Sequence, residues 1–210
     1  LAGVILAVGV MWAPALAHVL TRVVTREGWA DTGLRPNLRQ GWPYWLAAWF
    51  LPGILTVIGM VVFFALFPAY FDPTLGTLMG MLPPGISVDP WVLAAAQTFQ
   101  AMLIAPLINS LFTFGEEFGW RGYLQPKLMP LGGRKAILMV GVIWGVWHAP
   151  IIAMGHNYGL TYPGAPWFGI LLFVWIAVLF AMLLGWVTLR GGSVWPAVIG
   201  HAAINGIAGL

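Results

Sequence analysis

Two adjacent glutamates, Glu116 and Glu117, and an arginine, Arg121, follow the uncharged stretch over 90–115. Glu117 and Arg121 are four residues apart with the acid first, which is the favourable order for an ion pair on a helix. Glu116 lies about 100° around the helix from Glu117 and cannot easily share that arginine. A carboxylate without its own cation in a low-dielectric site suits a general base. The segment therefore predicts one structural glutamate and one catalytic glutamate.

A second candidate lies in the stretch GVIWGVWHAP, where Trp144 and His148 share one helical face with Gly141 and Gly145. The two glycines let a neighbouring helix approach closely beside the imidazole. A histidine in such a place serves either catalysis or an interhelical hydrogen bond. The stretch alone leaves both interpretations open.

The third candidate is the pair His201 and Asn205 in VIGHAAINGIAG. The two residues are four apart, so their polar groups point the same way on a helix. They suit binding of an oxyanion, or of a metal through the histidine, and a simple polar contact between helices is the alternative. His156 is expected to be solvated in an outer turn, and His18 has no assignment.

The composition places these polar groups inside a membrane protein. The chain has 210 residues, of which 60% are hydrophobic and 7% charged, and its mean hydropathy is +0.90. These values exceed those of soluble domains. The absence of cysteine excludes disulfides, thiolate metal sites and cysteine nucleophiles. The net charge of +3 is not a nucleic-acid signal, because the basic residues are placed by membrane topology.

The uncharged runs predict an all-α, polytopic transmembrane helical bundle that forms a single domain over 1–210. A spanning helix needs about 20 apolar residues, and the run over 136–189 is long enough for two helices joined by a turn at 155–166. The chain opens at Leu1 within an apolar run, so we expect a truncated start that leaves room for an upstream helix. Six spans are predicted, at roughly 1–23, 42–69, 91–120, 136–153, 166–189 and 193–210.

The basic residues fall in alternate loops of this arrangement, around 22–39, 121–135 and at Arg190. Under the positive-inside rule these loops face the cytoplasm. Glu116 lies toward the same side, so we expect a multi-pass protein of the cell membrane whose active site opens toward the cytoplasm.

Taken in order, EEFGWR, WGVWH and HAAIN fit the patterns EExxxR, aromatic-xxx-His and HxxxN. The chain thus resembles the CAAX prenyl protease and bacteriocin-processing family of intramembrane endopeptidases, called CPBP or ABI. The resemblance implies that Glu116 and His148 activate water, that His201 and Asn205 stabilise the oxyanion, and that Glu117 and Arg121 support the site. One departure is Trp144, which stands where the family commonly has phenylalanine.

The resemblance also implies a peptide or lipidated protein as substrate in the bilayer, and no nucleic acid. It leaves the cofactor open, because Glu116, His148 and His201 could ligate a divalent metal such as zinc or act without one. Two other functions remain as alternatives. The chain could be a non-proteolytic scaffold or bacteriocin-immunity protein of this family, or a small proton-coupled transporter, although no internal repeat of the transporter kind is visible.

Overall fold

The computed structural model describes the backbone of residues 2–208 and the side chains of residues 8–208, and within these bounds it is helical without strands. This confirms the predicted fold class. The α-helices are α1 (Ala2–Thr25), α2 (Leu38–Leu66), α3 (Gly76–Met79), α4 (Pro90–Phe99), α5 (Ala105–Gly119), α6 (Gln125–Leu128), α7 (Gly133–Trp147), α8 (Ala149–Ala153), α9 (Trp167–Gly191) and α10 (Trp195–Ile207). Short 3-10 turns lie at Pro68–Tyr70 and Met129–Leu131, and π-helical turns at Gln100–Ile104 and Trp120–Leu124.

Five helical stretches among the described residues are long and apolar enough to cross a membrane. They correspond to the first five predicted spans, although the first stretch begins at Val8 and so covers only part of the predicted span 1–23, whose position 1 lies outside the described residues. The predicted sixth span, 193–210, is instead the short helix α10, and positions 209–210 are outside the described part. Its 13 residues extend about 20 Å, less than the roughly 30 Å of a bilayer core. The five stretches are Val8–Thr25, Leu38–Leu66, Pro90–Leu131, Gly133–Ala153 and Trp167–Gly191.

The third stretch remains continuous because neighbouring groups compensate for its irregular turns. Pro106 has no N–H, so it cannot bond the carbonyl four residues earlier, that of Met102. The indole N–H of Trp49 on α2 donates to this carbonyl at 2.7 Å. A proline inside a spanning helix is therefore tolerated through a polar group on a neighbouring helix.

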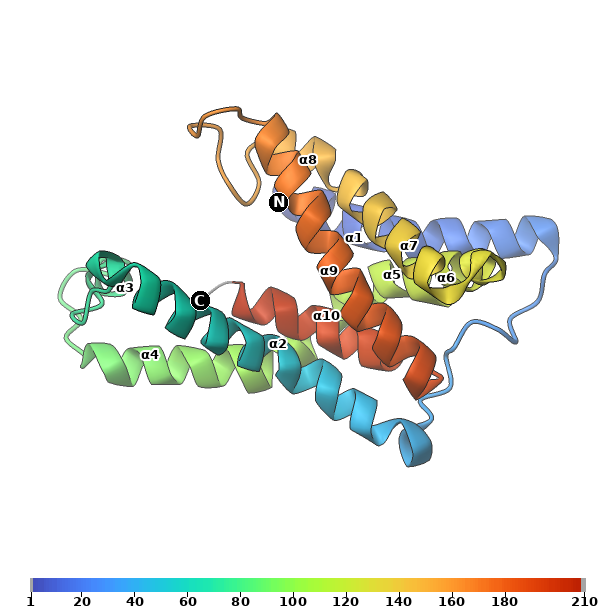
Figure 1. The fold of residues 1–210 in the computed structure, drawn as a ribbon, viewed down its shortest axis with the longest axis horizontal. Coiled ribbons are helices and arrows are strands. Elements are labelled where there is room, and N and C mark those ends of the chain that lie inside the picture. The colour runs from blue at the N-terminus through green and yellow to red at the C-terminus, as the bar shows by residue number, and fades with distance from the viewer. Residues whose placement is uncertain (1, 209–210) are drawn as a thin grey trace.

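Helix α5 carries the two glutamates and packs against α1 on one side and α10 on the other. Figure 1 shows α10 in the middle of the molecule, where it also packs against α2 and α9. Helix α7 packs along α9. The chain thus surrounds the end of α5 with helices that come from both ends of the sequence.

The start of α10 is held by the connection between α1 and α2. The side-chain amide of Asn37 donates to the Gly191 carbonyl at 2.7 Å, where α9 ends, and Gly192 follows with a φ of 62°. The N–H of Val194 donates to the Gly33 carbonyl at 2.9 Å. These hydrogen bonds fix the residue at which α10 begins. They therefore fix the position of His201 along the axis of α5.

Close packing of α1 on α5 depends on Gly115 and Gly119, which lie four residues apart and enclose the two glutamates. A Cβ on Gly115 would lie 2.6 Å from the Met11 carbonyl oxygen, and one on Gly119 would lie 2.6 Å from the Pro14 carbonyl carbon. Real Cβ atoms do not approach backbone that closely, so the helices must separate if either glycine is replaced. Small residues four apart are a common basis of helix contact in membranes.

We expect Gly119→Ala to destabilise the protein by about 1–3 kcal/mol, because the added methyl group collides with α1 backbone rather than with a movable side chain. The matched control is Gly59→Ala in α2, where a Cβ would meet nothing within 4 Å. This control should be neutral or stabilising by up to about 1 kcal/mol, since alanine is the better helix former. Unfolding of both variants in detergent measures the difference, and equal stabilities would contradict the described α1–α5 contact.

Candidate active site

The EExxxR segment lies at the end of α5 and in the π-helical turn that follows it. Glu116, Glu117 and Arg121 are 3%, 0% and 2% exposed. Nη1 of Arg121 donates to Oε1 of Glu117 at 2.8 Å, so the ion pair predicted from the i, i+4 spacing is confirmed. Because a buried charge without a partner costs several kcal/mol, this pairing is required for the segment to remain buried.

His201 on α10 also binds Glu117. Its Nδ1 lies 2.8 Å from the same Oε1 that accepts from Arg121, and the residue is 4% exposed. A carboxylate accepts hydrogen bonds, so the proton lies on Nδ1 and the second ring nitrogen, Nε2, points to other partners. The 100° offset of the two glutamates predicts that Glu116, and not Glu117, faces His201 and Asn205. The structure instead joins the first and third motifs through Glu117.

Trp144 on α7 contacts the polar groups of all three motifs. Its indole N–H donates to Oε2 of Glu116 at 2.5 Å, and its ring covers the Arg121 guanidinium at 4.8 Å from the ring centre. The His201 ring lies edge-on to it at 5.1 Å, and the His148 ring lies at 5.9 Å. A phenylalanine would keep the ring contacts but has no N–H donor. Trp144 is therefore a polar partner of Glu116 as well as a packing residue.

His148 follows the last residue of α7 and is half-buried. Its Nδ1 lies 2.8 Å from the Trp144 carbonyl oxygen, and its ring lies 4.6 Å from that of Phe173 on α9. The close approach of a neighbouring helix predicted from the two glycines is confirmed. A Cβ on Gly145 would lie 2.6 Å from the Cα of Val174, also on α9.

Asn205 lies one turn beyond His201 on α10, about 6 Å further along the axis, and is exposed whereas His201 is buried. The structure thus gathers Glu116, Glu117, Arg121, His148 and His201 around Trp144, and it leaves Asn205 at the margin of this group. The expected exposure of His156 is also found.

Three further polar residues support the site and were missed in the sequence. Thr113 donates to the Val198 carbonyl at 3.0 Å and Asn109 to the Ala202 carbonyl at 3.3 Å, so both tie α5 to α10. The indole N–H of Trp120 approaches Oε2 of Glu116 at 3.3 Å. Positions 109, 113, 116 and 117 share one face of α5, and this polar stripe on an apolar helix is the signal that could have identified the first two.

The three candidate metal ligands do not form a metal-binding group in this arrangement. Nδ1 of His201 donates to Glu117 and Nδ1 of His148 to a backbone carbonyl, so only Nε2 of each ring and Oε1 of Glu116 could face a metal ion. Within residues 8–208, no set of three or more His, Asp or Glu side chains is placed to hold a metal ion.

A cavity of about 350 Å³ lies beside the supporting half of the site. Arg121 and Gln125 line it, and each has buried polar atoms without a described protein partner, namely Nε and Nη2 of the arginine and Oε1 of the glutamine. These unpaired donor and acceptor atoms suit the cavity to water or amide groups. Its other polar lining residues are Asp31, Thr188 and Ser193.

Comparisons with known proteins indicate the family of the chain. The family model described as type II CAAX prenyl endopeptidase Rce1-like matches residues 90–207, which include every residue of the three motifs. The chain is 29% identical over 149 residues to CAAX prenyl protease 2 of Methanococcus maripaludis, a match that covers 69% of this chain and 53% of that protein. The chain therefore spans about half the length of this relative. No solved structure matches the chain.

The matched region is more than half of the chain, and it begins at α4 and ends with α10, so it contains the whole arrangement around Trp144. This confirms the resemblance indicated by the three motifs. The protein, an integral membrane protein with five apolar helices among its described residues, belongs to the type II CAAX prenyl endopeptidase Rce1-like family.

Proposed function

We propose that the chain is an intramembrane endopeptidase that hydrolyses peptide bonds of membrane-associated or lipidated, CAAX-type substrates, with residues 1–210 acting as one catalytic domain. The observation that carries the proposal is the carboxylate of Glu116, which is buried in a membrane protein and bound by indole N–H groups rather than by a cation. Family membership and the printed name of the relative, CAAX prenyl protease 2, support the substrate class.

Glu116 is the proposed general base. Both indoles bind its Oε2, so Oε1 is the oxygen that would accept a proton from water. His148 would hold the same water. With its Nδ1 proton donated to the Trp144 carbonyl, its Nε2 carries a lone pair that accepts a hydrogen bond. A base fixed by donors on one oxygen keeps its orientation while the other oxygen reacts.

His201 and Asn205 are the proposed oxyanion-binding residues. When both nitrogens of His201 are protonated, Nδ1 donates to Glu117 and Nε2 is available to donate to a developing negative charge. Glu117 thus orients the imidazole and balances its charge, much as the acid of a catalytic triad does. Asn205, exposed one turn away, would reach the oxyanion from the substrate side.

Water, Glu116 and the two oxyanion-binding residues are sufficient to account for every proton and electron pair in the reaction. The water oxygen attacks the scissile carbonyl carbon while Glu116 takes a proton, and the carbonyl electrons move to the oxygen bound by His201 and Asn205. When the tetrahedral intermediate collapses, the carbon–nitrogen bond breaks and Glu116 returns its proton to the leaving amine. The products are a new carboxylate and a new amine.

Several observations support a site that opens toward the cytoplasm in a cell-membrane protein. The cavity beside Arg121 is lined by the connection between α1 and α2 and by the connection between α9 and α10. These connections adjoin basic residues, which the positive-inside rule places in the cytoplasm. Water would enter the site from this side, where Arg121 and Gln125 retain unpaired polar atoms.

We expect Glu116→Gln to lower cleavage by on the order of 10³-fold, because glutamine keeps the shape and an acceptor for Trp144 but cannot take a proton. The assay uses purified protein in liposomes with prenylated and unprenylated CAAX peptides, read by mass spectrometry. The control is Glu27→Gln, at an exposed position between α1 and α2, which should cleave within about twofold of the unchanged protein. Full cleavage by Glu116→Gln would refute the assigned base. Cleavage of no peptide by the unchanged protein would favour a non-proteolytic scaffold or a carrier.

Treatment with a chelator distinguishes a water activated by Glu116 and His148 from a water activated by a metal ion. We expect cleavage to continue at an unchanged rate after dialysis against a strong chelator, since no three His, Asp or Glu side chains of the described residues are placed to hold a metal ion. Loss of cleavage that returns on addition of zinc would contradict this part of the proposal and would assign the water to a metal instead. A chelated sample without zinc, checked for folding by circular dichroism, controls for unfolding.

A further inference from the structure

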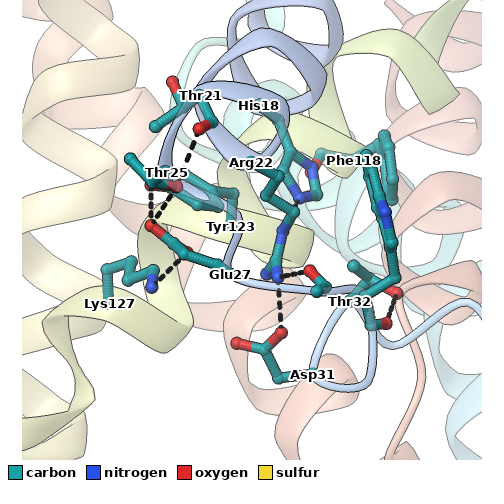
Figure 2. A network of polar contacts seen from close by, with 12 residues as sticks. His18, Thr21, Arg22, Thr25, Glu27, Asp31, Thr32, Phe118, Tyr123 and Lys127 are labelled. Atoms are coloured by element: carbon teal, nitrogen blue, oxygen red, sulfur yellow. Dashed lines mark hydrogen bonds and ion pairs between the residues drawn. The ribbon is translucent and has the colours of Figure 1, made fainter.

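His18 on α1 is a buried histidine that the proposed reaction does not use. It is 1% exposed and lies outside the family-matched region 90–207. Its Nδ1 lies 2.8 Å from the main-chain oxygen of Phe118, the residue directly after Glu117 (Figure 2). A bond between elements 100 residues apart in sequence thus ends on the backbone that carries both glutamates.

Arg22 fixes the state of this histidine. Its Nε donates to Nε2 of His18 at 2.5 Å, so Nε2 must be the acceptor and the proton lies on Nδ1, from which it is donated to Phe118. Arg22 is itself 2% exposed, and its Nη1 binds the Gly28 carbonyl and the carboxylate of Asp31 at 2.7 Å. The hydrogen bond from Arg22 holds the pKa of Asp31 below its ordinary value, so this ion pair is lost only as the pH falls through that lowered pKa.

The backbone at Phe118 needs an external anchor because the helix changes its hydrogen-bond pattern just after it. Residues Trp120–Leu124 form a π-helical turn, and the Gln125 N–H donates to the Trp120 carbonyl five residues back. Such turns interrupt the regular ladder and change the direction of the side chains around them. The hydrogen bond from His18 to the Phe118 carbonyl restrains the last regular α-helical turn before the π-helical turn. That turn carries Glu116 and Glu117.

The surroundings of His18 restrict its movement. Its ring centre lies 4.2 Å from that of Phe118, 4.8 Å from that of Tyr123 and 5.9 Å from that of Trp29. The backbone contacts of α1 with Gly115 and Gly119 lie on the same side of α5. Helix α1 therefore holds the glutamate segment from the side opposite to α10.

We propose that His18 is a positioning residue for the glutamate segment. Through its bond to the Phe118 oxygen, with its tautomer fixed by Arg22, it sets the direction in which α5 presents Glu116 and Glu117 to Trp144 and His201. This inference rests on the proposed endopeptidase function. It adds α1, which carries none of the three motifs, to the catalytic machinery.

The test uses two substitutions that separate the two hydrogen bonds of the imidazole. His18→Asn places an amide N–H near the position of Nδ1 and can still donate to Phe118. His18→Gln reaches the position of Nε2 and can accept from Arg22, but it leaves the Phe118 oxygen without its donor. Both amides are similar in size and polarity, so a purely structural role of the side chain would affect the two variants alike.

We expect His18→Gln to lower kcat for CAAX-peptide cleavage by about 10- to 100-fold, with KM changed less than about threefold, because a misplaced base impairs the reaction more than substrate binding. His18→Asn should keep kcat within about threefold of the unchanged protein. Glu27→Gln, at an exposed position after α1, should also keep kcat. Thermal unfolding in detergent and hydrogen exchange at residues 116–122 are measured for each variant, and exchange should rise in His18→Gln only.

Equal kcat values for His18→Asn and His18→Gln, or losses that follow the folded fraction alone, would overturn the inference. If His18→Gln does not fold, the exchange and kcat values of His18→Asn decide, since raised exchange at 116–122 or a kcat loss above tenfold would also overturn it. An inactive unchanged protein would refute the proposed function instead. In that case the exchange measurement still tests the anchoring of α5 by His18.

Discussion

The hydrogen bond from the Trp144 indole to Glu116 is the interaction on which the arrangement of the site depends. A carboxylate buried in a membrane protein must find donors inside the bundle, because lipid supplies none. Helix α7 meets this need with an indole, and the same ring contacts Arg121, His148 and His201. One side chain thus fixes the relative positions of three helices that carry three separate motifs.

The need for internal donors is met differently at the second glutamate, Glu117. Glu117 accepts from Arg121 and from His201 on a single oxygen, so its charge is balanced and its orientation fixed. These two bonds suit Glu117 to hold α5 and α10 together. Glu116 has only indole donors, which leaves it the acid suited to proton transfer. The Glu117–Arg121 ion pair holds the site together, but burying its two charges costs desolvation free energy. Its net contribution to the free energy of unfolding is therefore small.

The sequence predicted contacts that depend on residue spacing within one helix. It did not predict contacts that depend on how two helices are rotated against each other. The Glu117–Arg121 pair follows from spacing within α5, and the approach of α9 follows from two glycines on α7. Which glutamate meets His201 depends on how α10 is rotated against α5, and no spacing within one segment specifies that. Asn205 lies four residues from His201 on α10, as in the sequence interpretation, and is exposed. The apolar run after 193 also predicted a span, because composition does not separate a helix buried by protein from one facing lipid.

The most direct measurement of the central interaction is a double-mutant cycle on unfolding free energy, with Trp144→Phe, Glu116→Leu and the double variant. A hydrogen bond to a charged acceptor predicts a coupling energy of about 1.5–3 kcal/mol. The cycle of Trp144→Phe with Glu27→Leu is the control, and its two effects should add within about 0.5 kcal/mol because the two residues share no described contact partner. If the Trp144 and Glu116 effects add equally well, the indole does not hold the carboxylate and the account is wrong.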